Sequence, residues 1–142
     1  MNKLVTKHIE FECAHLLNGY DGGCKNLHGH SYKLEVTLIG PSQRWGMIMD
    51  FKELKKILES VVPDHKFVGR MDDPVVIDMV SVLDKYNLDY VLYPFDTTAE
   101  NMVEYFVSKI NHAISSKGYK KVEVFEAKLW ETSTSYAEWR AI

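Results

Sequence analysis

Two histidines and a cysteine lie within one seven-residue stretch, Cys24 to His30. His28 and His30 are two residues apart, so on a β-strand their side chains point to the same face. A third histidine, His15, ends an earlier stretch of alternating residues, on its apolar side. Three neutral imidazoles that meet at one point leave a zinc ion an open fourth position. The spacing therefore predicts a zinc site on these three histidines, while iron, copper and nickel also accept imidazole ligands.

The role of Cys24, four residues before His28, is open from spacing alone. A nearby cation stabilises a thiolate, so Cys24 can serve as a base or a nucleophile. It can equally be a fourth zinc ligand in a structural site, or an ordinary loop thiol. The other cysteine, Cys13, alternates with Phe11 on the apolar side of its strand, which predicts a small core residue.

Other ionisable residues offer acid–base or binding chemistry. Asp64 and His65 follow the residue that ends a predicted helix. A carboxylate can set the tautomer of a neighbouring histidine, which would prepare His65 for acid–base chemistry. Adjacent side chains often point apart, however, so the two can also be an ordinary surface pair. Glu131 lies at the end of an apolar strand, and a partly buried carboxylate there needs a hydrogen-bond partner. A ligand with a guanidine-like edge could supply it, because a carboxylate can accept two parallel hydrogen bonds from such an edge. Glu100 has a structural interpretation, since it completes a capping box with Thr97.

The elements that must position these residues follow from hydrophobic periodicity and capping signals. The expected elements are strands over 4–15, 28–39, 90–93, 121–130 and 136–141, and helices between Asp50 and Pro63, over 75–85 and between Thr97 and Gly118. If the first two strands pair as a hairpin with a long loop, the three histidines meet on one side of the sheet. Hairpins at both ends with helices between them indicate an α+β fold, an antiparallel sheet with helices packed on one face.

The composition fits one globular domain over residues 1–142, with 46% hydrophobic and 26% charged residues. It excludes a disordered or fibrous chain, and the net charge of -3 does not suggest a nucleic-acid binder. Two cysteines are too few for a disulfide scaffold. The beginning of the chain lacks the apolar stretch of a signal peptide, and no apolar run approaches the roughly 18 residues of a membrane span. We therefore expect a cytoplasmic protein that binds neither nucleic acid nor membrane.

Six short motifs, spread in order over nearly the whole chain, together resemble one family. They are Phe11 to His15 (F-x-A-A-H, with Cys13 for the first alanine), Cys24 to His30 (C-x-x-x-H-G-H), Met47 to Phe51 (G-x-V-x-D-F), Asp64 to Lys66 (D-H-[KH]), Thr98 to Asn101 (T-[AS]-E-N) and Glu131-Thr132 (E-T). This pattern resembles the 6-pyruvoyl-tetrahydropterin synthase superfamily. The three-residue gap between Cys24 and His28 is similar to its 6-carboxy-5,6,7,8-tetrahydropterin synthase branch.

The resemblance implies a tunnelling fold (T-fold) and a homohexamer of two stacked trimers, with active sites between subunits. It also implies zinc on the three histidines. The implied roles of the other residues are catalysis for Cys24, Asp64 and His65, and substrate binding for Glu131, Glu100 and Thr98. Asp64 and His65 can come from a neighbouring subunit.

The implied activity is a zinc-dependent lyase reaction of queuosine-type 7-deazapurine synthesis. It converts 7,8-dihydroneopterin triphosphate to 6-carboxy-5,6,7,8-tetrahydropterin, acetaldehyde and triphosphate. One alternative stops at 6-pyruvoyltetrahydropterin after loss of triphosphate. A second is a non-catalytic pterin- or purine-binding homologue with structural zinc on Cys24 and the histidines. A third is a general zinc hydrolase, although the sequence lacks the H-E-x-x-H helix of the commonest zinc proteases.

Overall fold

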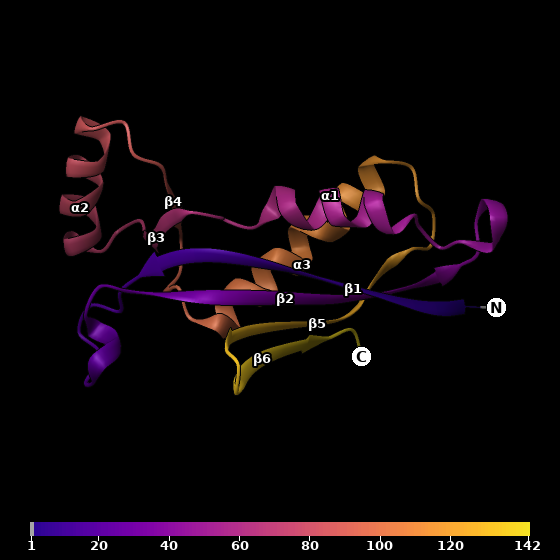
Figure 1. The fold of residues 1–142 in the computed structure, drawn as a ribbon, viewed down its shortest axis with the longest axis horizontal. Helices are drawn as coiled ribbons and strands as arrows, with labels where there is room; N and C mark the ends of the chain where they lie inside the picture. Colours follow the sequence, from indigo (N-terminus) through magenta and orange to yellow (C-terminus); the bar gives the residue numbers. More distant parts are fainter. Residues whose placement is uncertain (1) are drawn as a thin grey trace.

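Two long strands, β1 (Asn2–His15) and β2 (His28–Pro41), form the middle of the sheet and pair antiparallel along their whole length (Figure 1). The register places His15 opposite His28, and Cys13 opposite His30. Alternate residues of both strands are buried, as period-2 alternation requires for a half-buried strand. The predicted hairpin with a long loop is therefore confirmed.

The computed structural model describes residues 2–142, in which six strands have the order β4-β3-β1-β2-β5-β6. The outer strands are β3 (Lys66–Arg70), β4 (Tyr90–Tyr93), β5 (Glu123–Thr132) and β6 (Ser135–Arg140). Antiparallel pairing joins β1, β2, β5 and β6, as the sequence predicts. β3 joins β1 in parallel and β4 joins β3 in parallel, so the sheet is mixed at this edge. Parallel neighbours need a crossover, and a helix supplies it between β3 and β4.

The helices are α1 (Phe51–Val61), α2 (Pro74–Lys85) and α3 (Ala99–Ser116). α1 packs against α3 and β1, and α3 packs against β5 and β6. α2 is the crossover between β3 and β4 and lies away from the other two helices (Figure 1). It contributes Val76 to a separate small cluster with Leu16 and Phe67. No helix within residues 2–142 is both long and apolar enough to cross a membrane.

Helix capping matches the sequence signals at α1 and corrects them at α3. Asp50 caps α1 by accepting a hydrogen bond from the Lys52 backbone N–H at 2.7 Å. The cap of α3 is Thr98, whose hydroxyl accepts from the Asn101 backbone N–H at 3.3 Å. The predicted capping box from Thr97 to Glu100 is therefore wrong, because Thr97 is turned into the interior and is 1% exposed.

The hydrophobic core between the sheet and the helices extends along β1 as far as the end of the strand at His15. Phe11 stacks on Tyr32 at 5.0 Å between ring centroids and meets Phe106 edge-on at 6.0 Å. Cys13, the next inward residue of β1, is buried, which confirms its predicted core role. Burial raises the pKa of the Cys13 thiol to about 12, so this thiol is inert at neutral pH. His15 follows as the last inward residue of the strand.

Candidate metal centre

The three histidines meet at the end of the β1–β2 hairpin, on the sheet face that carries the core. One ring nitrogen from each of His15, His28 and His30 lies within 4.8 Å of the others. The ring centroids are 4.6 to 5.4 Å apart. The strand register explains this, because His15 pairs directly with His28 and His30 lies two residues further on the same face. These three side chains form a group that could hold a metal ion.

Backbone carbonyls fix the protonated nitrogen in two of the three rings. His15 Nδ1 lies 2.8 Å from the Thr97 carbonyl oxygen, and His28 Nδ1 lies 2.7 Å from that of Asn26. A carbonyl oxygen only accepts, so each Nδ1 carries the proton and each neutral ring presents Nε2 as a lone pair. The two Nε2 atoms are 3.1 Å apart. Two lone pairs at this distance repel each other unless a cation lies between them, so the donor set fits a metal ion.

Burial favours the neutral form of two of these rings, His15 and His30. It lowers the pKa of His15 to about 4, against an opposing effect of the hydrogen bond to the Thr97 carbonyl. The pKa of His30 is also lowered, first by burial, while the Glu131 carboxylate acts in the opposite direction. Neutral imidazole is the form that binds a metal ion. At pH 7 these side chains are therefore ready to act as ligands without losing a proton.

Glu131 lies beside the histidine group. Its Oε1 is 3.1 Å from His30 Nε2, but the two atoms are not aligned as a hydrogen bond. His30 Nε2 is consequently a buried nitrogen without a hydrogen-bond partner among residues 2–142. A polar atom of this kind is costly unless something binds it. The contact places a carboxylate at the edge of the candidate metal site, while the predicted substrate-binding role of Glu131 stays a prediction.

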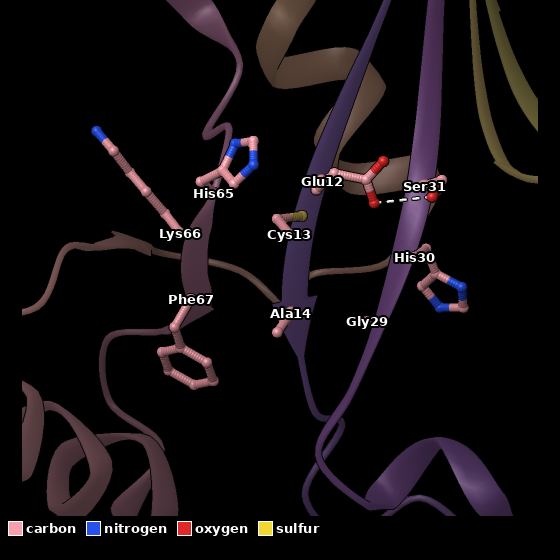
Figure 2. A pocket seen from close by; sticks show the side chains of 9 residues that line it. All are labelled: Glu12, Cys13, Ala14, Gly29, His30, Ser31, His65, Lys66 and Phe67. Atoms are coloured by element: carbon pink, nitrogen blue, oxygen red, sulfur yellow. Dashed lines mark hydrogen bonds between the residues drawn. The ribbon is translucent and has the colours of Figure 1, made fainter.

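Three hollows adjoin one another around His30 and Glu131. The first, about 470 Å³, has His30 and His65 in its lining (Figure 2). The second, about 520 Å³, is lined by His30, Trp130 and Glu131. The third, about 420 Å³, is lined by Glu131 and Glu100. Each volume lies in the range of small-molecule sites. His65 and Glu131 thus each share a hollow with His30, and Glu100 shares one with Glu131.

Asp64 and His65 contact each other, with 2.9 Å between Asp64 Oδ1 and His65 Nδ1. Asp64 Oδ1 also accepts from the Glu12 backbone N–H at 2.9 Å, and the His65 backbone N–H donates to the Glu12 carbonyl at 2.6 Å. The Glu12 N–H, and then His65, hold the pKa of Asp64 below its usual value. The His65 side chain remains 78% exposed and lies beside β1 (Figure 2).

Three residues predicted for catalysis or substrate binding do not line these hollows: Cys24, Asp64 and Thr98. Cys24 is half-buried in a short 3-10 helix (Gly23–Lys25), and its thiol does not belong to the histidine group within residues 2–142. That arrangement gives no support to a four-ligand structural site within one chain. The hydroxyl of Thr98 caps α3 and does not line the third hollow. Catalytic and substrate-binding roles for these residues stay predictions.

Sequence reasoning missed Thr97, which contacts His15 through both its carbonyl and its hydroxyl oxygen. The doublet Thr97-Thr98 contained a signal, because one helix needs only one capping hydroxyl. The second threonine was therefore available for another contact.

Comparison with known proteins adds independent evidence. The family model described as 6-pyruvoyl tetrahydropterin synthase matches residues 4–141. The 6-carboxy-5,6,7,8-tetrahydropterin synthase of Haemophilus influenzae is 34% identical over 96% of this chain and 97% of its own. The Aquifex aeolicus protein of the same name is 35% identical over 82% of this chain and 75% of its own.

Solved structures share the fold at lower identity. An uncharacterized protein from Wolinella succinogenes has a TM-score of 0.81 at 21% identity, covering 100% of this chain and 99% of its own. The 6-pyruvoyl tetrahydropterin synthase of Caenorhabditis elegans has a TM-score of 0.68 at 21% identity, covering 100% of this chain and 97% of its own. The predicted α+β tunnelling fold is therefore confirmed.

Proposed function

The chain belongs to the 6-pyruvoyl tetrahydropterin synthase family, and from this membership we propose that it is a zinc-dependent 6-carboxy-5,6,7,8-tetrahydropterin synthase. In this proposal it converts 7,8-dihydroneopterin triphosphate to the 6-carboxy product, acetaldehyde and triphosphate, in queuosine-type 7-deazapurine synthesis. Residues 1–142 would act as one pterin synthase domain in the cytoplasm. The observation that carries the proposal is the pair of histidine lone pairs 3.1 Å apart, beside a carboxylate.

The metal ligands in the proposal are His15, His28 and His30. A bound zinc ion supplies Lewis-acid chemistry toward the oxygens of the substrate side chain. The protein contributes rings whose tautomers two backbone carbonyls already fix. Preorganised ligands of this kind lose little freedom when they bind.

Glu131 would hold the pterin ring. A carboxylate can accept two parallel hydrogen bonds from the amino and ring N–H groups at the guanidine-like edge of a pterin. Since Glu131 adjoins His30, a ring held there would direct its side chain toward the three histidines. Glu100 lines the same hollow as Glu131 and would contact another part of the substrate. Thr98 would help to shape this pocket through the start of α3.

Cys24 and His65 would move the protons. Because His65 Nδ1 faces the ionised Asp64, its Nε2 is the nitrogen left to accept or donate a proton at the substrate. Cys24, as a thiolate, would take a proton from the opposite side of the substrate side chain. Asp64 would orient His65 rather than touch the substrate.

We place the complete active site between subunits of a homohexamer, a dimer of trimers. Two observations support this. The Asp64–His65 pair is open to solvent, and Cys24 lies outside the histidine group of its own chain. A neighbouring copy would then bring its own Asp64 and His65 to a substrate held by Glu131.

A mass-spectrometric product assay tests the function. Zinc-loaded protein is incubated anaerobically with 7,8-dihydroneopterin triphosphate, and 6-carboxytetrahydropterin with acetaldehyde is the expected result. A 6-pyruvoyl product would replace the proposal with the biopterin-type reaction at the same site. Zinc binding without turnover would overturn it in favour of a non-catalytic pterin-binding homologue.

A further inference from the structure

The segment between β4 and α3, residues 94–98 (the 94–98 loop), reaches the candidate metal site through one residue. Thr97 is 1% exposed, and His15 Nδ1 lies 2.8 Å from its carbonyl oxygen and 3.1 Å from its Oγ1. The N–H of His15 is therefore shared between two oxygens of the same residue. Both contacts lie on the side of the ring opposite Nε2, the atom that faces His28.

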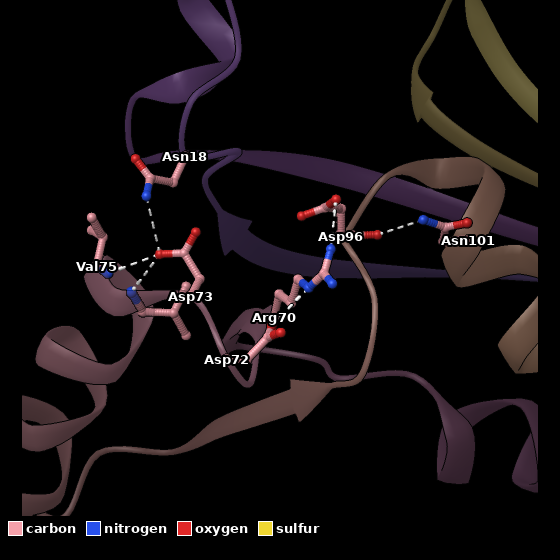
Figure 3. Close-up of polar contacts among 8 residues, drawn as sticks. Asn18, Arg70, Asp72, Asp73, Val75, Asp96 and Asn101 are labelled. Atoms are coloured by element: carbon pink, nitrogen blue, oxygen red, sulfur yellow. Dashed lines mark hydrogen bonds and ion pairs between the residues drawn. The ribbon is translucent and has the colours of Figure 1, made fainter.

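The neighbours of Thr97 on both sides hold the loop in place. The Asp96 carbonyl accepts from the Asn101 side-chain amide at 2.9 Å and from the Thr98 backbone N–H at 2.8 Å (Figure 3). The Thr98 hydroxyl in turn caps α3. Thr97 therefore lies between two residues that hydrogen bonds hold in place. The start of α3 thus keeps its side chain directed inward.

An ion pair ties the same loop to the end of β3. Arg70 Nη1 lies 3.2 Å from Asp96 Oδ2, while Arg70 Nε donates to Asp72 Oδ1 at 2.7 Å (Figure 3). The second contact holds the guanidinium group in the direction of the loop. Arg70 thus connects the end of β3, the strand next to the edge strand β4, with the residue that precedes Thr97.

We propose that Thr97 is a positioning residue for His15, and that the Arg70–Asp96 ion pair holds the loop from which it acts. This inference rests on the proposed function only in that His15 binds the metal. The Thr97 hydroxyl fixes the ring plane in addition to the tautomer, because a donor shared by two acceptors has one preferred orientation. Partners of this kind orient a metal ligand, and their loss weakens metal binding.

Thr97→Val removes the hydroxyl and keeps the carbonyl and the side-chain shape. The expected result is a zinc dissociation constant about 10-fold higher, measured by competition with a chromophoric chelator. Thr97→Ser keeps a hydroxyl and should bind zinc as the wild-type protein does. Wild-type affinity in Thr97→Val, or an equal loss in both variants, would overturn the role of the hydroxyl.

Arg70→Met tests the ion pair and should raise the zinc dissociation constant about threefold, since exposed ion pairs contribute little each. If the Arg70–Asp96 pair acts by holding the Thr97 hydroxyl on His15, the double variant with Thr97→Val should lose no more than Thr97→Val alone. Additive losses would overturn the connection. Arg140→Met breaks a comparable exposed pair with Glu138 and should leave zinc affinity unchanged.

A metal-free readout separates this inference from the proposed function. In nitrogen-15 NMR spectra of the zinc-free protein, His15 should show the Nδ1–H form, with a ring N–H that exchanges slowly with water. Exchange should be faster in Thr97→Val and unchanged in Thr97→Ser. If His15→Ala still binds zinc as wild type, the metal assignment fails. If His15→Ala loses zinc while Thr97→Val changes neither affinity nor exchange, only the positioning role fails.

Discussion

The two faces of the β1–β2 hairpin differ at the same end of the sheet. On the core face, His15 is 2% exposed and its ring is held by the Thr97 carbonyl. On the outer face, Glu12 accepts a hydrogen bond from the Ser31 hydroxyl, and His65 beside it is largely exposed. The core face is organised by contacts within one chain. The outer face offers an acid–base residue that lies open to solvent.

If the proposed roles hold, this difference would place two kinds of chemistry at one end of the sheet. Metal ligands gain from burial, because neutral rings and fixed tautomers are what a cation requires. A residue that moves protons must keep access to the substrate, and water competes with it until a substrate or a neighbouring copy covers it. Substitutions on the core face should therefore change metal binding, whereas those on the outer face should change turnover alone.

The largest expected effect is loss of the metal from the core face. His28→Ala removes one of three ligands and should weaken zinc binding by at least about 100-fold, since two imidazoles no longer surround the ion. Metal content after dialysis, measured by atomic emission, checks this. His112→Ala changes an exposed histidine on α3 and should retain zinc fully. A His28→Ala protein with full zinc content would reject the ligand assignment.

Cys24→Ala should separate chemistry from metal binding. Zinc content should stay at the wild-type level, while turnover falls by about 10²- to 10⁴-fold, the usual contribution of a general acid or base. Product formation and metal content are measured on the same sample. Cys13→Ala is the matched thiol control, because Cys13 is buried in the core and should affect turnover little. Retained activity in Cys24→Ala would exclude its catalytic role, and loss of zinc would make it a ligand.

The burial of His15 also predicts how the metal-free protein responds to acid. Its pKa is about 4 in the folded protein and 6.5 in an unfolded chain, so the unfolded chain takes up the proton first as pH falls. The free energy of unfolding should be unaffected by His15 above pH 6.5. It should fall by about 3 kcal/mol between pH 6.5 and pH 4, and His30 acts in the same direction.

Urea unfolding at several pH values in the presence of a chelator measures this slope. His15→Gln should reduce it, and His112→Gln should not. An unchanged slope in His15→Gln would show that the ring is not buried in the neutral form.

The core-face site could be read from the sequence because it follows from strand alternation. His15 extends the row of Phe11 and Cys13, and His28 and His30 extend the row that begins at Tyr32. A strict two-residue period decides the face of every side chain once a hairpin is assumed. Predicting the histidine group needed no further information than this pattern and the pairing of two strands.

The outer-face pair could not be read in this way, because its geometry depends on contacts distant in sequence. His65 has a φ of 58°, a left-handed conformation that non-glycine residues adopt rarely and that no local signal predicted. It is held there by the backbone of Glu12, 52 residues from Asp64. The parallel strand β3 was missed as well. It pairs with β1, which is distant in sequence, and the pairing covers only two register positions.

Of the catalytic-residue variants expected to slow turnover, Asp64→Asn on the outer face should have the smallest effect. An asparagine can still accept from the Glu12 N–H, but it no longer fixes the proton on His65 Nδ1 by charge. Turnover should fall about tenfold, because water partly replaces a partner at an exposed site. Zinc affinity should be unchanged, and Asp78→Asn on the exposed side of α2 should change neither. A loss of zinc in Asp64→Asn would mean that the two faces are coupled through β1, and the separation of metal binding from proton transfer would no longer hold.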